Sequence, residues 1–178
     1  MSTPRIAPGT RREIGLLNDL VARASGRFAG TGRPNLFTTL AKHRALFRGW
    51  LWFASAIMPR GTLPRKETEL AILRVAHLRT CEYEFAHHAR LGKKAGLTDL
   101  DVERVKAGAE APGWSEREQI LMRATTMLHA QHDLDDATWH ALRGHMTEKE
   151  CLELVLLVGH YDMLATTITT LRIQVDTP

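Results

Sequence analysis

The sequence predicts an all-α fold, organised as a bundle of helices within a single domain. Alternation of apolar and polar residues, which marks half-buried strands, is almost absent. Apolar residues instead recur three or four positions apart, and several of these runs begin at residues that cap helices. The length of 178 residues is close to that of one domain and allows a substantial core.

The first third of the chain is expected to hold two helices joined by a glycine-rich linker. Residues 11–24 carry apolar side chains at helical spacing and predict an amphipathic helix. Residues 26–34 would form the linker, because they lack the strand–glycine–helix context of a phosphate loop. A long helix is expected over residues 35–58, in which Trp50 and Trp52 are interpreted as core or subunit-interface anchors rather than a ligand-stacking site.

The middle of the chain contains the most apolar predicted helix. Pro59-Arg60-Gly61 should end the preceding helix, and Pro64 suits the first turn of the next one. That helix would run to about Leu78 and is apolar nearly all round, which indicates burial. A carboxylate on such a helix, that of Glu69, needs a partner.

Further helices are expected over the rest of the chain, each bounded by a capping or turn signal. They are a helix after a break near Thr80 that ends at Ala95-Gly96, a short helix over residues 98–108, a helix that begins at the capping box of Ser115 and Glu118, a shorter helix over residues 135–144, and a last helix from the capping box of Thr147 and Glu150 to about Leu171. The last helix is mostly apolar and is expected to be the central element. So much apolar helical surface also favours a homo-oligomer.

Composition narrows the functional classes. The net charge is +4, but basic residues are scattered among acidic ones without a Lys/Arg stripe, so nucleic-acid binding is not expected. Only two cysteines are present, which indicates a reduced, cytoplasmic setting rather than a disulfide framework. The amino terminus has no apolar signal region, and the most apolar run, residues 151–158, is too short to span a bilayer, so no membrane association is expected.

The chemically distinctive stretch is residues 69–88, which reads ELAILRVAHLRTCEYEFAHH. Cys81, Glu84 and His88 recur there at i, i+3 and i+7 and would share one helical face. If Cys81 lies in the first turn after the predicted break, backbone N–H groups and the helix dipole would lower the pKa of its thiol. The neighbouring carboxylates act in the opposite direction, and the alternative is an inert, partly buried cysteine.

The carboxylate and imidazole of this stretch form a second candidate pair. Glu84 and His88 are four residues apart and can hydrogen-bond directly, which would raise the basicity of the imidazole. The alternative is an ordinary surface pair worth about 0.2–0.5 kcal/mol. Tyr83 and His87 are candidates for substrate binding. Tyr83 could border a pocket near the helix start, and His87 ranks below His88 because it points more than a quarter turn away.

The other histidines give no convincing metal site. His129 and His132 are three residues apart with Asp133 beside them, but a third ligand is lacking. Neither a metal nor a cofactor is therefore expected.

At these residues the chain resembles a known family, the carboxymuconolactone decarboxylase and alkylhydroperoxidase D group, also called the AhpD-like fold. The resemblance rests on the order of Glu69, Cys81 twelve residues later, Glu84 and His88. The peroxidase branch of the family has the pattern E-x11-C-x-x-C-x3-H. The resemblance therefore implies an AhpD-like helical bundle with a small-molecule site at these positions.

The flanking sequence agrees with the same family. Residues 63–105 resemble its central helical pair, and residues 159–176 resemble the final helix of a large subgroup. The resemblance covers roughly residues 36–176, which leaves residues 1–34 as an N-terminal helix and linker. The family implies dimers, trimers or hexamers.

The chain departs from the peroxidase pattern at one position. Glu84 stands where that branch has the peroxide-reactive second cysteine, whose proton relay is formed by the glutamate and histidine that match Glu69 and His88. A disulfide cycle within the motif therefore cannot run. Cys81 alone could be oxidised to a sulfenic acid, but an external thiol would have to resolve it.

The decarboxylase branch works without a redox cysteine pair, and its resemblance implies proton transfer on a small cyclic carboxylate or lactone. His88 would shuttle the proton, Glu69 would be the base that orients His88, and Glu84 would serve as a second acid or base. Cys81 and Tyr83 would line the pocket.

Three functional hypotheses follow. The leading one is a small-molecule enzyme that uses this acid–base chemistry on a carboxylate or lactone-like substrate. The second is a thiol-dependent alkylhydroperoxidase that uses Cys81. The third is a non-catalytic, oligomeric binding protein with a vestigial site, in which no pocket joins Glu69, Glu84 and His88.

Overall fold

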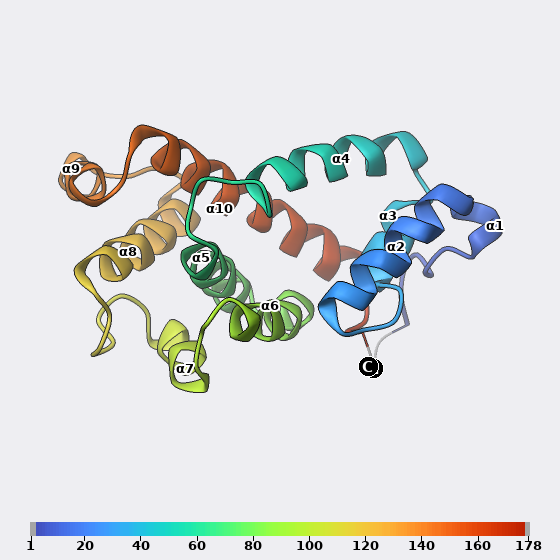
Figure 1. Ribbon diagram of the computed structural model, residues 1–178, viewed down its shortest axis with the longest axis horizontal. Coiled ribbons are helices and arrows are strands. Elements are labelled where there is room, and N and C mark those ends of the chain that lie inside the picture. Colours follow the sequence, from blue (N-terminus) through green and yellow to red (C-terminus); the bar gives the residue numbers. More distant parts are fainter. Residues whose placement is uncertain (1–2, 177–178) are drawn as a thin grey trace.

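The computed structural model describes residues 3–176, which fold into one all-α domain, as the sequence predicts (Figure 1). No strand occurs within this range. The helices are α1 (Arg11–Ile14), α2 (Leu16–Ala29), α3 (Asn35–Leu40), α4 (Arg44–Ile57), α5 (Arg65–Leu78), α6 (Glu82–Lys94), α7 (Asp99–Ala107), α8 (Glu116–Gln131), α9 (Asp136–His145) and α10 (Glu148–Leu171).

The central element is α5, not α10 as the sequence suggested. Every residue of α5 from Glu67 to Ala76 is buried, and α6, α7, α8 and α10 all pack against it. Figure 1 shows α5 between these helices, with α1 to α3 at one end of the molecule and α9 at the other. The nearly continuous apolar sequence of α5 explains this position, since only a helix covered on all sides buries such a surface.

The last helix, α10, is longer and more apolar than its core contacts require. Within residues 3–176, it alone is long and apolar enough to cross a membrane, yet half of its most apolar window is buried in the fold. That buried half serves the core, as in the central helix of a globular domain. Leu152, Leu156 and Met163 remain exposed on the other face, and the expected homo-oligomer stays a prediction.

The N-terminal helix is divided, and the linker after it is shorter than predicted. Gly15 takes a positive φ of 83° and separates α1 from α2. The second helix then continues through Gly26, which the sequence analysis placed in the linker. A Cβ added at Gly26 would lie 1.7 Å from the carbonyl oxygen of Gly32, so the returning chain crosses the helix too closely for any other residue.

The predicted long helix over residues 35–58 is divided in the same way. A turn at residues 41–43 separates α3 from α4, and Nδ1 of His43 accepts a hydrogen bond from the N–H of Leu46 at the start of α4. Phe37 of α3 and Trp50 of α4 consequently meet edge to face, with ring centroids 5.3 Å apart. Trp52 is 73% exposed and does not belong to the core, contrary to one of its two predicted roles.

The loop after α4 is fixed against α10. Glu153 of α10 accepts hydrogen bonds from the N–H and hydroxyl of Thr62 and from the N–H of Leu63. Because three donors bind one buried carboxylate, this loop has a defined position. It holds Met58 and Pro59 beside the cavity described below.

The predicted break near Thr80 joins α5 to α6. Thr80 adopts a positive φ of 50°, and Cys81 then forms the N-cap of α6. The turn lays α6 against α5, where the Cβ position of Gly92 lies 3.6 Å from Cβ of Glu69. Residues far apart in the sequence, Glu69 and His88, are thereby brought together.

Candidate functional site

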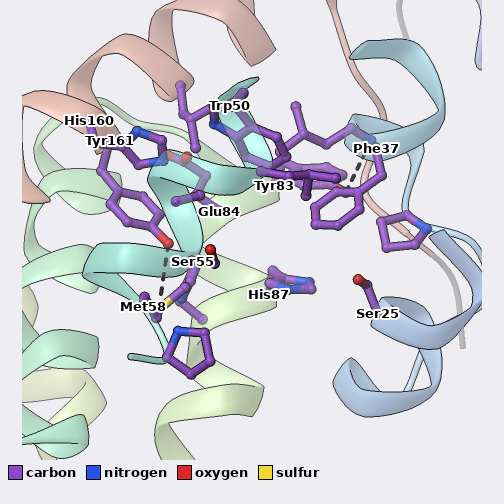
Figure 2. Close-up of a pocket in the computed structure, with 17 residues that line it drawn as sticks. Ser25, Phe37, Trp50, Ser55, Met58, Tyr83, Glu84, His87, His160 and Tyr161 are labelled. Atoms are coloured by element: carbon purple, nitrogen blue, oxygen red, sulfur yellow. Dashed lines mark hydrogen bonds between the residues drawn. The ribbon is translucent and has the colours of Figure 1, made fainter. Parts of the chain in front are cut away.

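A cavity of about 260 Å³ lies between the N-terminal helices and the core of the domain (Figure 2). Its walls come from α3 and α4 on one side and from α6 and α10 on the other. Aromatic and aliphatic side chains form most of the lining, among them Phe37, Trp50, Leu51, Tyr161 and Leu164. The polar side chains are fewer and include Glu84, His87, His88 and His160. An apolar cavity with a few convergent polar groups is the usual form of a small-molecule site.

Glu69 and His88 form a buried pair at the base of this cavity. Nδ1 of His88 lies 2.8 Å from Oε2 of Glu69, and Arg65 donates a hydrogen bond to Oε1 of the same carboxylate. Glu69 is completely buried, so this arrangement supplies the partner that the sequence analysis required. Because an ionised carboxylate only accepts hydrogen bonds, this contact favours the tautomer with its proton on Nδ1, which leaves Nε2 as the basic nitrogen of a ring that lines the cavity.

Glu84 does not pair with His88, although their spacing suggested it. Both carboxyl oxygens of Glu84 are buried and have no hydrogen-bond partner among the described residues. Burial therefore raises the pKa of Glu84 to about 8, an effect that the Cys81 thiol partly offsets and the charge of Asp162 reinforces. At neutral pH this side chain is a protonated, uncharged acid in the same cavity as the imidazole of His88.

Cys81 lies outside the cavity, contrary to the expectation that it lines the pocket. It is 3% exposed and borders two other pockets, formed with α10 in one case and with Phe85 and Lys106 in the other. Burial, followed by the nearby charge of Glu84, raises the pKa of its thiol to about 12. The lowered pKa suggested by the helix start is thus wrong, because the backbone N–H groups of Tyr83 and Glu84 do not compensate for lost hydration.

This environment predicts a slow thiol. A rise in pKa from 9.0 to about 12 reduces the thiolate fraction at neutral pH by roughly 10³-fold. Iodoacetamide should therefore modify Cys81 at pH 7.5 at least about 100-fold more slowly in native protein than in urea, measured by mass spectrometry of the Cys81 peptide. Cys151, which is also buried, provides the internal comparison. Rapid labelling of native Cys81 alone would contradict the assignment of an inert thiol.

Tyr83 and His87, the two predicted substrate-binding residues, both line the cavity. The hydroxyl of Tyr83 donates to Oδ2 of Asp176 at 2.6 Å and accepts from the N–H of Leu36, so this ring is held by the C-terminal segment and α3. Figure 2 shows His87 extending between Ser55 and Ser25. Its Nδ1 is buried without a partner, and burial lowers its pKa to about 3.

The sequence analysis missed the contribution of α10 to the cavity. His160 stacks on Trp50 with ring centroids 6.1 Å apart, and burial lowers the pKa of His160 to about 4. Tyr161 meets the ring of His88 edge to face at 5.1 Å, and its hydroxyl contacts the sulfur of Met58 (Figure 2). The available signal was an imidazole within a mostly apolar helix. Trp50 is likewise more than a core anchor, because it lines the cavity.

His129, one of the two histidines considered for a metal site, has another partner. Nδ1 of His129 lies 2.7 Å from Oδ1 of Asp162 on α10. Among residues 3–176, no group of three His, Cys, Asp or Glu side chains could hold a metal ion.

Comparison with known proteins finds a family model that matches part of the chain. Residues 44–127 match the model of the carboxymuconolactone decarboxylase family, a stretch that includes Glu69, Cys81, Glu84 and His88. No curated protein matches the chain by sequence.

Solved structures share the fold over nearly the whole chain. An uncharacterised peroxidase-related protein from Silicibacter sp. TM1040 has a TM-score of 0.81 and 14% identity, covering 99% of this chain and 95% of that one. An AhpD-core peroxidase-related protein from Ralstonia eutropha JMP134 has a TM-score of 0.80 and 20% identity, covering 97% and 93%. The debrominase Bmp8 has a TM-score of 0.77 and 17% identity, covering 96% and 91%.

At these identities the structural matches establish the fold, and the similarity to the family comes from the sequence match over residues 44–127. The resemblance predicted from the order of Glu69, Cys81, Glu84 and His88 is confirmed. Residues 44–127 are similar to the carboxymuconolactone decarboxylase family, and they lie within an AhpD-like all-α fold.

Proposed function

We propose that this protein is a small-molecule enzyme that performs general acid–base chemistry on a lactone or carboxylate-like substrate. The observation that carries the proposal is the buried Glu69–His88 pair beside an enclosed, largely apolar cavity. A histidine oriented by a carboxylate is a common proton-transfer device, and the family match supports an enzyme of this kind.

Each polar group has a separate role in this reaction. Glu69 holds Nδ1–H of His88, so that Nε2 can remove a proton from the substrate. The imidazolium that forms is stabilised by the same carboxylate, whose position Arg65 fixes. Glu84, protonated at neutral pH, returns a proton or hydrogen-bonds to developing negative charge on an oxygen.

The environment of Cys81 makes the thiol-peroxidase alternative less favourable. A peroxidatic thiol must be ionised and accessible, whereas Cys81 is buried, has a raised pKa and does not line the cavity. The vestigial-site alternative predicts no pocket that joins the three acid–base residues. Its weakness is that Glu84 and His88 share one cavity and Glu69 contacts His88 directly.

The test is turnover of a panel of small lactones by wild type, His88→Ala and Cys81→Ser. We expect His88→Ala to lower kcat by about 10²- to 10⁴-fold, the usual contribution of a positioned base. Cys81→Ser, at the start of the same helix, is the comparison variant and should lower kcat far less than His88→Ala, since the thiol is outside the cavity and acts only on the pKa of Glu84. Equal rates in wild type and His88→Ala would end this assignment, and thiol-supported peroxide consumption lost in Cys81→Ser would favour the second hypothesis.

The proposed setting is a homo-oligomer in the cytoplasm. Both cysteines are free, which suits a reducing compartment. The exposed apolar face of α10, with Leu152, Leu156 and Met163, supports contact with another copy.

A further inference from the structure

Four residues that line the cavity carry buried polar atoms without a hydrogen-bond partner among the described residues. These atoms are both carboxyl oxygens of Glu84, Nδ1 of His87, Nδ1 of His160 and Nε1 of Trp50. A buried polar atom without a partner costs about 1–3 kcal/mol, so folding alone does not account for such a concentration. The arrangement is suited to a bound molecule that supplies the missing partners.

The cavity walls themselves carry few positive charges, and the guanidinium of Arg60 reaches them only from outside, through a hydrogen bond to Ser55. None of the residues that line it is Lys or Arg. The nearest guanidinium in the Glu69–His88 cluster, that of Arg65, is already bound to the carboxylate of Glu69. His87 and His160 are uncharged at neutral pH because burial lowers their pKa values to about 3 and about 4. An anionic ligand would therefore leave water without a Lys or Arg among the side chains that line the cavity, which is unfavourable.

The shape of the lining favours a flat ring. Trp50 packs edge to face against Phe37 and nearly parallel to His160, at an interplanar angle of 14°. A volume of about 260 Å³ is at the small end of ligand sites and suits one or two fused rings. Figure 2 shows Glu84, His160 and Trp50 at one end of this space, with His87 nearer Ser25 and Ser55.

We propose that the cavity binds an uncharged, planar ring compound with hydrogen-bonding oxygen or nitrogen atoms, and that it discriminates against the corresponding carboxylate. The indole N–H of Trp50 can only donate, so the ligand presents an acceptor there. Glu84 and the two histidines can donate or accept, according to the ligand. This inference deepens the proposed function, because it selects the neutral lactone rather than the ring carboxylate as the substrate. The binding preference does not depend on the proposed function, but the reaction that follows binding does.

The test compares phthalide, a neutral bicyclic lactone, with its ring-opened form, 2-(hydroxymethyl)benzoate. The two probes share one carbon skeleton and differ in charge at pH 7. Isothermal titration calorimetry of the full chain should show at least about tenfold tighter binding of phthalide, because no Lys or Arg lines the cavity to compensate the carboxylate. Equal or tighter binding of the benzoate overturns the proposal, and so does the absence of binding by both probes at millimolar concentration.

Two variants connect the preference to the cavity. Ser55 lies on its wall and is half-buried, so Ser55→Arg should shift the phthalide-to-benzoate ratio of Kd values by about tenfold toward the benzoate, whereas the neutral Ser55→Gln should not. Trp50→Phe keeps a ring but removes the N–H donor, and should weaken phthalide binding about five- to tenfold. An unchanged ratio in Ser55→Arg, or unchanged phthalide affinity in Trp50→Phe, would argue for binding elsewhere.

These experiments distinguish a failure of the binding inference from a failure of the proposed function. His88→Ala should still prefer phthalide over the benzoate, even where turnover of lactones is lost. A protein with the predicted preference but no turnover would overturn the proposed function and keep this inference. Turnover of ring carboxylates with no preference for neutral ligands would overturn this inference and keep the proposed function.

Discussion

Glu69→Gln is expected to lower kcat on a lactone substrate by about 10²- to 10⁴-fold while the protein remains folded. The carboxylate of Glu69 accepts a hydrogen bond from Nδ1 of His88 and so leaves Nε2 unprotonated toward the cavity. A glutamine amide can instead donate to Nδ1, which places the ring proton on Nε2 and removes the base. The loss should be in kcat rather than KM, because Glu69 does not line the cavity.

Glu69→Ala separates this effect from a purely structural one. Truncation leaves both Arg65 and His88 without their common partner in a buried environment. We expect a loss of roughly 3 kcal/mol in the free energy of unfolding, at the low end for a broken buried pair because the Arg65 side chain is 33% exposed. Glu118→Gln, which breaks the more exposed Lys66 pair, should cost about 1 kcal/mol or less and leave kcat unchanged.

Urea unfolding and steady-state kinetics on the three variants check both statements. Wild-type kcat in Glu69→Gln would remove this residue from the mechanism. A loss of activity that merely followed the loss of stability across all three would reduce Glu69 to a structural role.

Features of the fold that depend on local sequence could be predicted. The capping boxes at Ser115 and Thr147 mark the starts of α8 and α10 in the structure, since a cap depends only on residues within one turn. The break at Thr80 follows in the same way from the sequence. The division of the helix over residues 35–58 could not be predicted from the sequence. Residues 41–43 contain neither glycine nor proline, and the turn depends on the side chain of His43.

The candidate site shows the limit of reasoning along one helix. The order of residues identified Glu69 and His88, and the spacing of four then favoured Glu84 as the partner of His88. The structure pairs His88 with Glu69, 19 residues earlier, as the resemblance implied and the spacing within α6 did not, because α6 packs against α5. Burial of Cys81 and the contribution of His160 depend on the same tertiary packing, which no periodicity within α6 encodes.

The cavity should also set how stability depends on pH, and Glu84 accounts for the decline on the alkaline side. Its pKa is about 8 in the folded protein and 4.5 by the ordinary value, so between these limits the folded state holds a proton that the unfolded state has lost. Stability contributed by this group is therefore complete below pH 4.5 and falls as pH rises toward 8, by about 1.4 kcal/mol per pH unit and roughly 5 kcal/mol in all. Above pH 8 the contribution is constant.

The two buried histidines act in the opposite direction. Their folded pKa values, about 3 for His87 and about 4 for His160, lie below the ordinary value of 6.5. The unfolded chain therefore binds protons below pH 6.5 that the folded protein excludes, and stability falls as pH decreases from 6.5. These three side chains together place the maximum of stability near pH 6.5, where each is uncharged in the folded protein.

Glu84→Gln isolates the alkaline limb of this dependence. Glutamine keeps the shape of the side chain but cannot ionise, so the decline from pH 6.5 to 8 should become shallower by about 1.4 kcal/mol per pH unit. At pH 9 the variant should be more stable than wild type by roughly 3–5 kcal/mol, and the two curves should approach each other near pH 5. Glu82→Gln, on the same helical turn but exposed, should retain the wild-type slope.

Urea unfolding from pH 5 to 9 measures all three curves. Parallel curves for wild type and Glu84→Gln would mean that Glu84 is ionised in the folded protein, and the cavity would then hold a negative charge at neutral pH. Such a charge would still disfavour a carboxylate ligand but would remove the proposed proton donor, so this measurement tests the acid of the mechanism without requiring a substrate.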